Sequence, residues 1–268
     1  MKTDRRVIVF LTIAFVWSWV SWFIAMHYLA PGINDKTIRP FITFLFIGLY
    51  GPLISAIVTT WYFDGFGGVV VLLKKLTIWK NPVIIYLTIV FLPLLISGAG
   101  IALYKICYGS VGRFDVHAIQ MVPIVLWAAL RAGPIGEEMG WRGFLLPALQ
   151  KQFSPLKSSL IIGFIWFAWH IPLFFAPYGT AVSGAPITVG AVLFFYIFVT
   201  CLACIYTWLV NRSNGSLLVA LLIHLSFNAG LLMLFFPDLA DHGKQVYYLS
   251  APVLIVFTLL LGLKTRFK

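Results

Sequence analysis

The chain has 268 residues, of which 61% are hydrophobic and only 10% are charged, whereas about a quarter of a soluble domain is charged. Its formal net charge is +11, but the basic residues lie almost wholly between apolar runs. That is the pattern of membrane topology signals and not of a nucleic-acid-binding face. The composition therefore excludes a soluble protein and a nucleic-acid partner, and predicts one membrane-embedded domain over residues 1–268.

Eight apolar runs have roughly the 20 residues that a helix needs to cross a bilayer. In chain order they cover residues 7–30, 41–63, 83–104, 118–149, 157–176, 185–210, 215–236 and 246–264. The predicted fold is all-α, a polytopic membrane protein with about eight transmembrane helices. The fourth run is too long for one simple span, and Gly133-Pro134 is expected to break or kink it. Residues 65–80 are expected to form a short helix at the membrane surface.

The basic residues are distributed unevenly between the two ends of these runs. With the N-terminus inside, the inner segments carry twelve: Lys2, Arg5, Arg6, Lys74, Lys75, Lys80, Lys151, Lys157, Arg212, Lys264, Arg266 and Lys268. The outer loops carry five: Lys36, Arg39, Lys105, Arg113 and Lys244. The positive-inside rule then predicts that both termini are cytoplasmic.

Few side chains inside the apolar runs can do chemistry, and two of them are adjacent acids. Glu137 and Glu138 are the only glutamates in the sequence. A charged side chain at bilayer depth costs roughly 2.5–3.5 kcal/mol on insertion scales, so it usually faces a protein interior or a water-filled cavity. The other polar groups at depth are His170, His224 and Asn228. This stretch of the chain is therefore the predicted site.

Helical spacing sorts these groups into pairs. Glu138 and Arg142 are four residues apart with the acid on the N-terminal side, the favourable order for an ion pair on one helix face. Glu137 points about 100° away from that face, so it is left to face a cavity. His224 and Asn228 are also four residues apart, so their polar ends share one face.

The depth of the polar groups gives an independent argument. Glu137, His170 and His224 lie 14, 13 and 12 residues, respectively, from a basic residue of the predicted cytoplasmic side. At about 1.5 Å per residue this places all three on the order of 20 Å from that side. Three different helices thus carry polar groups to a similar depth, which predicts one cluster, open to the cytoplasm or laterally to the bilayer.

The chemistry of the cluster favours a hydrolase. A buried carboxylate beside a neutral histidine can take a proton from water, and a second histidine with an asparagine amide can donate hydrogen bonds to a developing oxyanion. The same groups, Glu137, His170 and His224, can instead ligate a divalent metal such as zinc. The sequence leaves these two mechanisms open, although the H-E-x-x-H helix of common zinc proteases is absent. No organic cofactor is expected.

Three motifs lie in this order within the core, residues 118–236: E-E-x-x-x-R at 137–142, aromatic-x-x-x-H at 166–170 and H-x-x-x-N at 224–228. In order and in membrane context they resemble the CPBP family of intramembrane proteases. That family includes the Rce1-type CAAX prenyl endopeptidases and the bacterial Abi proteins. One departure is Trp166, where the family pattern usually has Phe; an aromatic wall is kept.

The resemblance implies an endopeptidase that cleaves a membrane-anchored or lipidated, CAAX-like peptide or protein in a prokaryotic cell membrane. It implies Glu137 and His170 as the activators of water, and His224 with Asn228 as the oxyanion site. Glu138 and Arg142 are implied as supporting residues. Some members are linked to peptide maturation or bacteriocin immunity, and both metal-dependent and metal-free mechanisms have been proposed for the family.

Two other classes of function remain open at this point. A proton-coupled transporter also places Glu, His and Arg residues at mid-depth. Against it, the halves of the chain show no convincing internal repeat, and the polar residues gather in the C-terminal half. The other class is a non-enzymatic membrane immunity or interaction protein, for which Glu137→Gln should leave cellular function intact.

Overall fold

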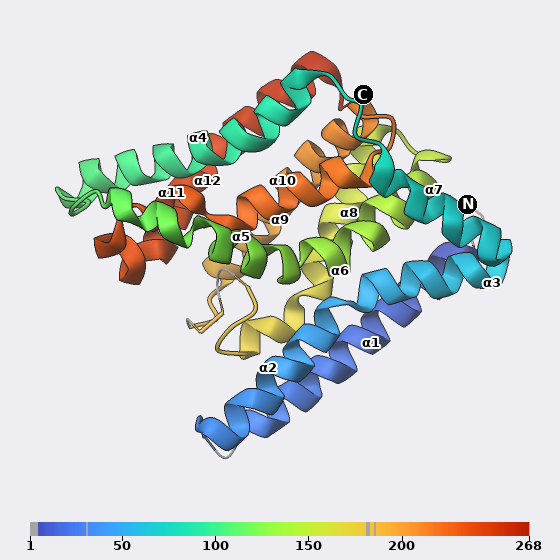
Figure 1. The fold of residues 1–268 in the computed structure, drawn as a ribbon, viewed down its shortest axis with the longest axis horizontal. Helices are drawn as coiled ribbons and strands as arrows, with labels where there is room; N and C mark the ends of the chain where they lie inside the picture. Colours follow the sequence, from blue (N-terminus) through green and yellow to red (C-terminus); the bar gives the residue numbers. More distant parts are fainter. Residues whose placement is uncertain (1–4, 31, 181–182, 185, 268) are drawn as a thin grey trace.

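The computed structural model describes residues 5–30, 32–180, 183–184 and 186–267. The protein is 83% helical, and its described residues contain no strand, which confirms the all-α prediction (Figure 1). Seven described segments are long and apolar enough to cross a membrane: Arg5–Leu29, Gly51–Thr77, Val83–Tyr108, Val116–Gln150, Val189–Arg212, Leu217–Leu234 and Pro237–Thr265. The chain is therefore an integral, multi-pass membrane protein.

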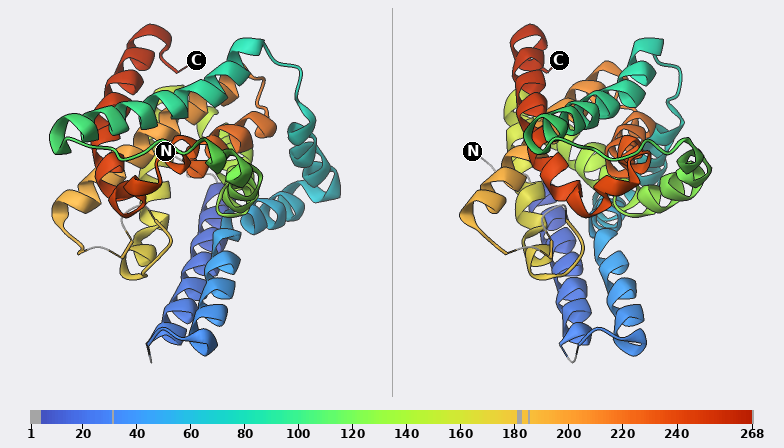
Figure 2. Two further views of the ribbon diagram at one scale, coloured as in Figure 1. Left: turned by 60° about the vertical axis from the view of Figure 1, so that its left-hand side comes forward. Right: turned by 90° about the vertical axis from the view of Figure 1, so that its left-hand side faces the viewer.

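The N-terminal helices form a hairpin that extends beyond the rest of the molecule (Figure 2). It consists of α1 (Arg5–Leu29) and α2 (Asp35–Leu49), and α3 (Gly51–Lys74) follows directly. The run 41–63, predicted as one span, is therefore divided between α2 and α3. The reason is local: α2 ends at Leu49, and Pro52 takes one of the first positions of α3, where its missing N–H group costs no hydrogen bond.

The second part of α3 corresponds to the helix predicted within residues 65–80. Gly65 has a φ of +68° and kinks α3, a conformation that costs glycine little because it lacks a Cβ atom. The helical path continues from there through η1 (Lys75–Thr77). A helix is thus present where one was predicted, but it begins inside α3 and is not a separate element.

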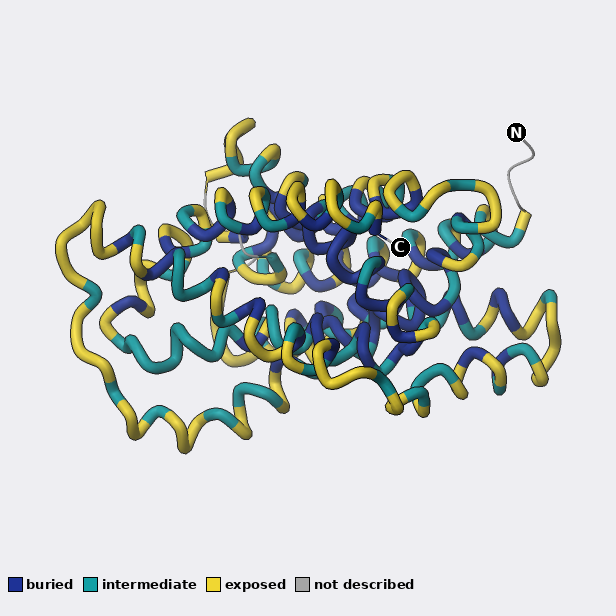
Figure 3. The backbone as a smooth tube through the Cα atoms, turned by 90° about the horizontal axis from the view of Figure 1, so that it is seen from above, coloured by how far each residue is buried: buried dark blue, intermediate teal, exposed yellow. Residues whose placement is uncertain are grey.

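The helix at residues 83–108 and the C-terminal half of the chain pack together in the body of the protein. α4 (Val83–Tyr108) packs against α12 (Gly243–Thr265), and α9 (Val189–Arg212) packs against α10 (Leu217–Ala229) and α12. The short helices α11 (Leu231–Leu234) and η5 (Pro237–His242) connect α10 to α12. Buried residues gather in the middle of the molecule, where these helices meet (Figure 3). Residue 185, where one span was predicted to begin, lies outside the described residues.

The long fourth run is interrupted as predicted. Its first part is η2 (Val116–Met121) and α5 (Val122–Arg131), and its second part is α6 (Pro134–Glu138), η3 (Met139–Leu145) and α7 (Leu146–Gln150). The break falls at Ala132 and Gly133, directly before the two glutamates. η3 is a π-helix of seven residues, an element that is rare and often found at functional sites. The sequence pattern did not predict it.

The predicted span at 157–176 is too short to cross a bilayer by itself. It forms α8 (Pro155–Trp169), a helix of 15 residues, followed by the 3₁₀ helix η4 (Ile171–Phe175). Pro172 fits the change, because it has no N–H group to continue the α-helical hydrogen bonds of α8 and is tolerated in the first turn of η4. The described chain therefore has seven candidate spans plus this shorter apolar helix, one long span fewer than the eight predicted.

Close packing places the acid-bearing segment against the break between α2 and α3. α6 and η3 both contact α3. A Cβ atom at Gly136 would lie 2.3 Å from the carbonyl oxygen of Leu49, and one at Gly140 would lie 2.5 Å from Cβ of Pro52. Only glycine allows this approach. Two glycines that flank the glutamates therefore fix their position in the fold.

Candidate active site

The two glutamates occupy the last turn of α6, immediately after the chain break. Gly133 has a φ of +135°, and its carbonyl accepts the Glu137 N–H at 2.8 Å, which starts the helix. Pro134 occupies one of the first helical positions. Glu137 is 3% exposed and Glu138 is fully buried. The break thus brings both acids into the interior, at the end of the short helix α6.

Glu138 connects two helices through one carboxylate oxygen. Its Oε1 accepts a hydrogen bond from Nη1 of Arg142 at 3.0 Å, so the ion pair predicted from the four-residue spacing is present. The same oxygen lies 2.7 Å from Nδ1 of His224 on α10. A carboxylate that pairs with arginine only accepts hydrogen bonds, so Nδ1 of His224 carries the hydrogen. In the neutral ring, Nε2 is then an acceptor.

This tautomer of His224 limits its expected role as a hydrogen-bond donor to an oxyanion. The resemblance implied that His224 donates a hydrogen bond to the oxyanion. With its hydrogen on Nδ1, the ring donates from Nε2 only when it holds a second proton. Sequence spacing did not reveal the Glu138–His224 contact, because the two residues are 86 positions apart.

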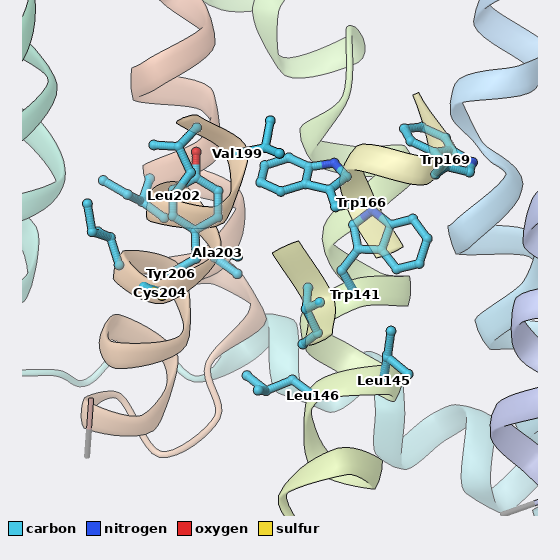
Figure 4. Packing of buried hydrophobic residues seen from close by; sticks show 14 of the residues in the cluster. Trp141, Leu145, Leu146, Trp166, Trp169, Val199, Leu202, Ala203, Cys204 and Tyr206 are labelled. Atoms are coloured by element: carbon cyan, nitrogen blue, oxygen red, sulfur yellow. The ribbon is translucent and has the colours of Figure 1, made fainter. Parts of the chain in front are cut away.

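The guanidinium of Arg142 is held between two aromatic rings. Its Cζ atom lies 4.7 Å from the ring centre of Trp166 on α8 and 4.7 Å from that of Tyr206 on α9 (Figure 4 shows both rings). Cation–π contacts of this kind contribute about 2 kcal/mol when desolvated. Nε and Nη2 of Arg142 make no hydrogen bond within the described structure. The rings of Trp166 and Tyr206 therefore stabilise the part of the buried guanidinium that has no hydrogen-bond partner among the described residues.

Glu137 points away from this ion pair. Its Oε2 accepts a hydrogen bond from the indole N–H of Trp166 at 2.5 Å, while its side chain lines a cavity. Trp166 was predicted only as an aromatic wall, and its role as a donor to Glu137 was missed. The one available signal was that a buried indole N–H needs an acceptor. The family pattern usually has Phe at this position, and a phenyl ring has no such donor.

His170 ends α8 and faces the same cavity. Its Nδ1 lies 2.7 Å from the carbonyl oxygen of Trp166, so Nδ1 is the donor and Nε2 is free to accept a hydrogen bond. The rings of Trp169 and Phe195 pack on it, with centroids at 4.7 and 5.4 Å. The ring is 8% exposed. It is therefore held rigidly with its acceptor nitrogen available.

Asn228 completes the wall from the end of α10. Its Nδ2 donates to the carbonyl oxygen of Ala132 at 3.1 Å, across the break between α5 and α6. An amide nitrogen has two hydrogens, so one is used here and the second remains available. Because a carbonyl oxygen only accepts, this contact also identifies which end of the side-chain amide faces Ala132.

The four predicted catalytic residues line one cavity of about 570 Å³: Glu137, His170, His224 and Asn228. The rest of its wall is largely apolar and comes mainly from α2, α4, α9 and α12, with Leu45, Ile96, Phe198, Val246 and Tyr247 among its residues. The supporting residues Glu138 and Arg142 lie behind this wall, fully buried or nearly so. The arrangement can hold an extended apolar segment beside a carboxylate.

The donor set does not match a zinc site. A catalytic zinc needs three protein ligands at about 2.0–2.3 Å, and the described residues contain no group of three or more His, Cys, Asp or Glu side chains that could hold a metal ion. Nδ1 of His224 is also engaged by Glu138. No step through a metal follows from these residues, and the zinc alternative stays a prediction.

Part of the chain is similar to known proteins. Residues 119–230 match the family model of the type II CAAX prenyl endopeptidase Rce1-like proteins, and this segment contains all the motifs named above. We call residues 119–230 the Rce1-like segment because of this similarity. The chain is also 29% identical over 127 residues to a CAAX prenyl protease 2 of Methanococcus maripaludis. That alignment covers 45% of this chain, and the chain spans 45% of the length of that relative.

The Rce1-like segment includes all four predicted site residues that line the cavity, Glu137, His170, His224 and Asn228. It begins shortly before α5 and ends at Gly230, directly after α10. The resemblance to Rce1-type proteins is thus confirmed, while the kinship with Abi proteins stays a prediction. The N-terminal hairpin, α4 and α12 lie outside the matched segment. They contribute much of the apolar wall, including Ile96 and Tyr247.

Proposed function

We propose that this chain is an intramembrane endopeptidase that hydrolyses a peptide bond of a membrane-associated or lipidated, CAAX-like peptide or protein. The observation that carries this proposal is the position of Glu137 in the Rce1-like segment. Its carboxylate lies on the wall of a largely apolar cavity with His170, His224 and Asn228. The indole N–H of Trp166 donates a hydrogen bond to Oε2 of this carboxylate and holds it in place.

Each polar residue of the cavity has one role in the proposed reaction. Glu137 takes a proton from the attacking water as general base, and His170, with its free Nε2, assists in orienting that water. Asn228 donates its second amide hydrogen toward the oxyanion that forms on the substrate carbonyl. Glu138 and Arg142 support the site by holding His224. The proton on Glu137 then passes to the leaving amide nitrogen as the C–N bond breaks.

The cavity wall indicates the class of substrate. Side chains from α2, α4, α9 and α12 make it largely apolar, and such a wall accommodates a hydrocarbon chain or a membrane-anchored peptide segment. The Methanococcus relative is named a CAAX prenyl protease, which supports a lipidated C-terminus as the first substrate to test. We place the protein in a prokaryotic cell membrane with both termini cytoplasmic.

The test is cleavage of an internally quenched peptide with a prenylated CAAX C-terminus by purified protein in detergent. Wild type, Glu137→Gln and the matched control Asp241→Asn are compared, because Asp241 is an exposed acid that does not line the cavity. Cleavage by wild type and Asp241→Asn, but not by Glu137→Gln, supports the proposal. Equal cleavage by Glu137→Gln contradicts it.

The alternative functions give different outcomes. Proton-coupled uptake by wild type in proteoliposomes, without peptide cleavage, supports a transporter. If Glu137→Gln leaves a cellular phenotype intact and no peptide is cleaved, the protein acts by binding. Each result replaces the endopeptidase proposal.

A further inference from the structure

Arg131 ends α5, directly before the chain break that leads to the two glutamates. Its guanidinium lies on two aromatic rings, with Cζ 5.7 Å from the ring centre of Phe46 on α2 and 5.8 Å from that of Trp127 on α5. Arg131 is exposed, and the described residues give its guanidinium neither a hydrogen bond nor an ion pair. Five N–H donors of this planar group therefore remain available to a ligand.

The depth of Arg131 makes an unpaired charge costly. Trp17 is at the centre of α1, a candidate span of 25 residues, and its indole N–H donates to the carbonyl oxygen of Ile47 at 2.9 Å. Phe46 precedes Ile47, so the guanidinium on its ring lies near the middle of that span. A charged side chain at such depth usually faces a water-filled cavity or binds a partner. Lipid phosphates are at the bilayer surface, roughly 15 Å away, so a substrate is the better source of an anion.

Arg131 is next to the cavity that contains Glu137. Its neighbour in the chain, Ala132, and its aromatic partner Phe46 both line that cavity. The described lining residues include no lysine or arginine, and Arg142, which lies behind the wall, is already paired with Glu138. An anionic group of a bound substrate therefore finds its cation at Arg131, between α2 and α5.

The separation between Arg131 and Glu137 suits a short C-terminal fragment. Arg131 is two residues from Gly133, where a Cβ atom would lie 2.8 Å from Oε1 of Glu137. Because successive Cα atoms are about 3.8 Å apart, the Cα atom of Arg131 is at most about 12 Å from that oxygen. Three residues of extended chain span roughly 10 Å. A bond about three residues from the C-terminus can thus reach Glu137 while the terminal carboxylate reaches Arg131.

We propose that Arg131 is a specificity-determining residue that binds the free C-terminal carboxylate of the substrate. The inference rests on the proposed function and makes it more specific, because it places the C-terminal side of the cleaved bond toward α2 and α5. A guanidinium donates two parallel N–H bonds to a carboxylate, and a carboxamide does not accept both. The rings of Phe46 and Trp127 restrict the guanidinium, which reduces the entropy lost when the carboxylate binds.

The test compares two prenylated peptides that differ only at the C-terminus, one a free acid and the other a carboxamide. Wild-type kcat/KM should be about 10–100-fold higher for the acid, as expected for hydrogen bonds to a charged group. Arg131→Met should lose this preference through a higher KM for the acid, with cleavage of the amide unchanged. Arg131→Lys should restore part of it, since lysine keeps the charge without the paired donors. Arg113→Met, an exposed position in the loop after α4, is the matched control and should behave like wild type.

The outcomes separate this inference from the proposed function. Equal wild-type cleavage of the acid and the amide overturns the inference and leaves the peptidase proposal standing. An Arg131→Met protein that cleaves both peptides more slowly to the same extent also overturns it, because a residue that only caps α5 or binds a lipid phosphate gives that result.

If the wild type cleaves neither peptide, the proposed function fails and binding decides the inference. Fluorescence anisotropy of the two labelled peptides is then measured with wild type and Arg131→Met. Tighter binding of the acid than of the amide by wild type, but not by Arg131→Met, supports the role of Arg131. Any other binding result overturns it.

Discussion

The buried pair of Glu138 and Arg142 allows a quantitative test of how the site is held together. Both side chains are 0% exposed, and Nη1 of Arg142 lies 3.0 Å from Oε1 of Glu138. We consider Arg142→Met, Glu138→Gln and the double variant. Arg142→Met leaves the buried carboxylate of Glu138 with His224 as its remaining partner. Glu138→Gln leaves the buried guanidinium of Arg142 between the rings of Trp166 and Tyr206.

Each single change removes one partner of a buried ion pair. Such a loss costs about 3–5 kcal/mol, because the remaining charge is buried without compensation. Removing the charge on both sides avoids that penalty. The double variant should therefore be less destabilised than the sum of the single variants by about 2–3 kcal/mol.

The free energy of unfolding is measured by titrating the denaturing detergent SDS into protein in mild micelles and following tryptophan fluorescence. Arg113→Met is the control, since Arg113 is exposed in the loop after α4, and it should change stability by no more than about 0.5 kcal/mol. If the two single effects add to within about 0.5 kcal/mol, the pair does not interact and the reasoning is refuted.

Three further predictions test individual contacts. Trp166→Phe keeps an aromatic ring but deletes the hydrogen-bond donor to Glu137. A hydrogen bond to a charged group contributes about 1.5–3 kcal/mol, so kcat should fall roughly 10–100-fold. An unchanged kcat would refute this role of Trp166. Extended treatment with a chelator should leave the cleavage rate unchanged, whereas a loss that zinc restores would establish a metal enzyme. Gly136→Ala places a methyl group 2.3 Å from the Leu49 carbonyl and should lower the free energy of unfolding by about 1–3 kcal/mol; Gly67→Ala, which meets no atom within 4 Å, should not.

The residues of the site were predictable because each depends on local spacing. An acid and a base four residues apart share a helix face in any helix, which predicts the Glu138–Arg142 pair. Similar distances from basic residues place three polar groups at one depth, and the structure does bring Glu137, His170 and His224 to one cavity. Their catalytic roles remain proposals, as do the cytoplasmic termini and the single-domain organisation.

What escaped prediction depends on contacts between distant parts of the chain. The Glu138–His224 bond and the Trp166–Glu137 bond each join different helices, and no periodicity reveals such a pairing. The π-helix after Glu138 has no reliable sequence signal. The described residues contain seven long candidate spans and the shorter apolar helix α8, and the apolar length of residues 157–176 did not predict that this helix has only 15 residues.

The central claim is that Glu137 activates water for attack on a peptide bond. It is tested most directly by digesting the prenylated peptide in water enriched in ¹⁸O, with wild type and Glu137→Gln in parallel, and weighing the products by mass spectrometry. Wild type should give a product whose new C-terminal carboxyl group carries one ¹⁸O atom from the water. Glu137→Gln should give no product. Equal amounts of labelled product from both proteins would contradict the account.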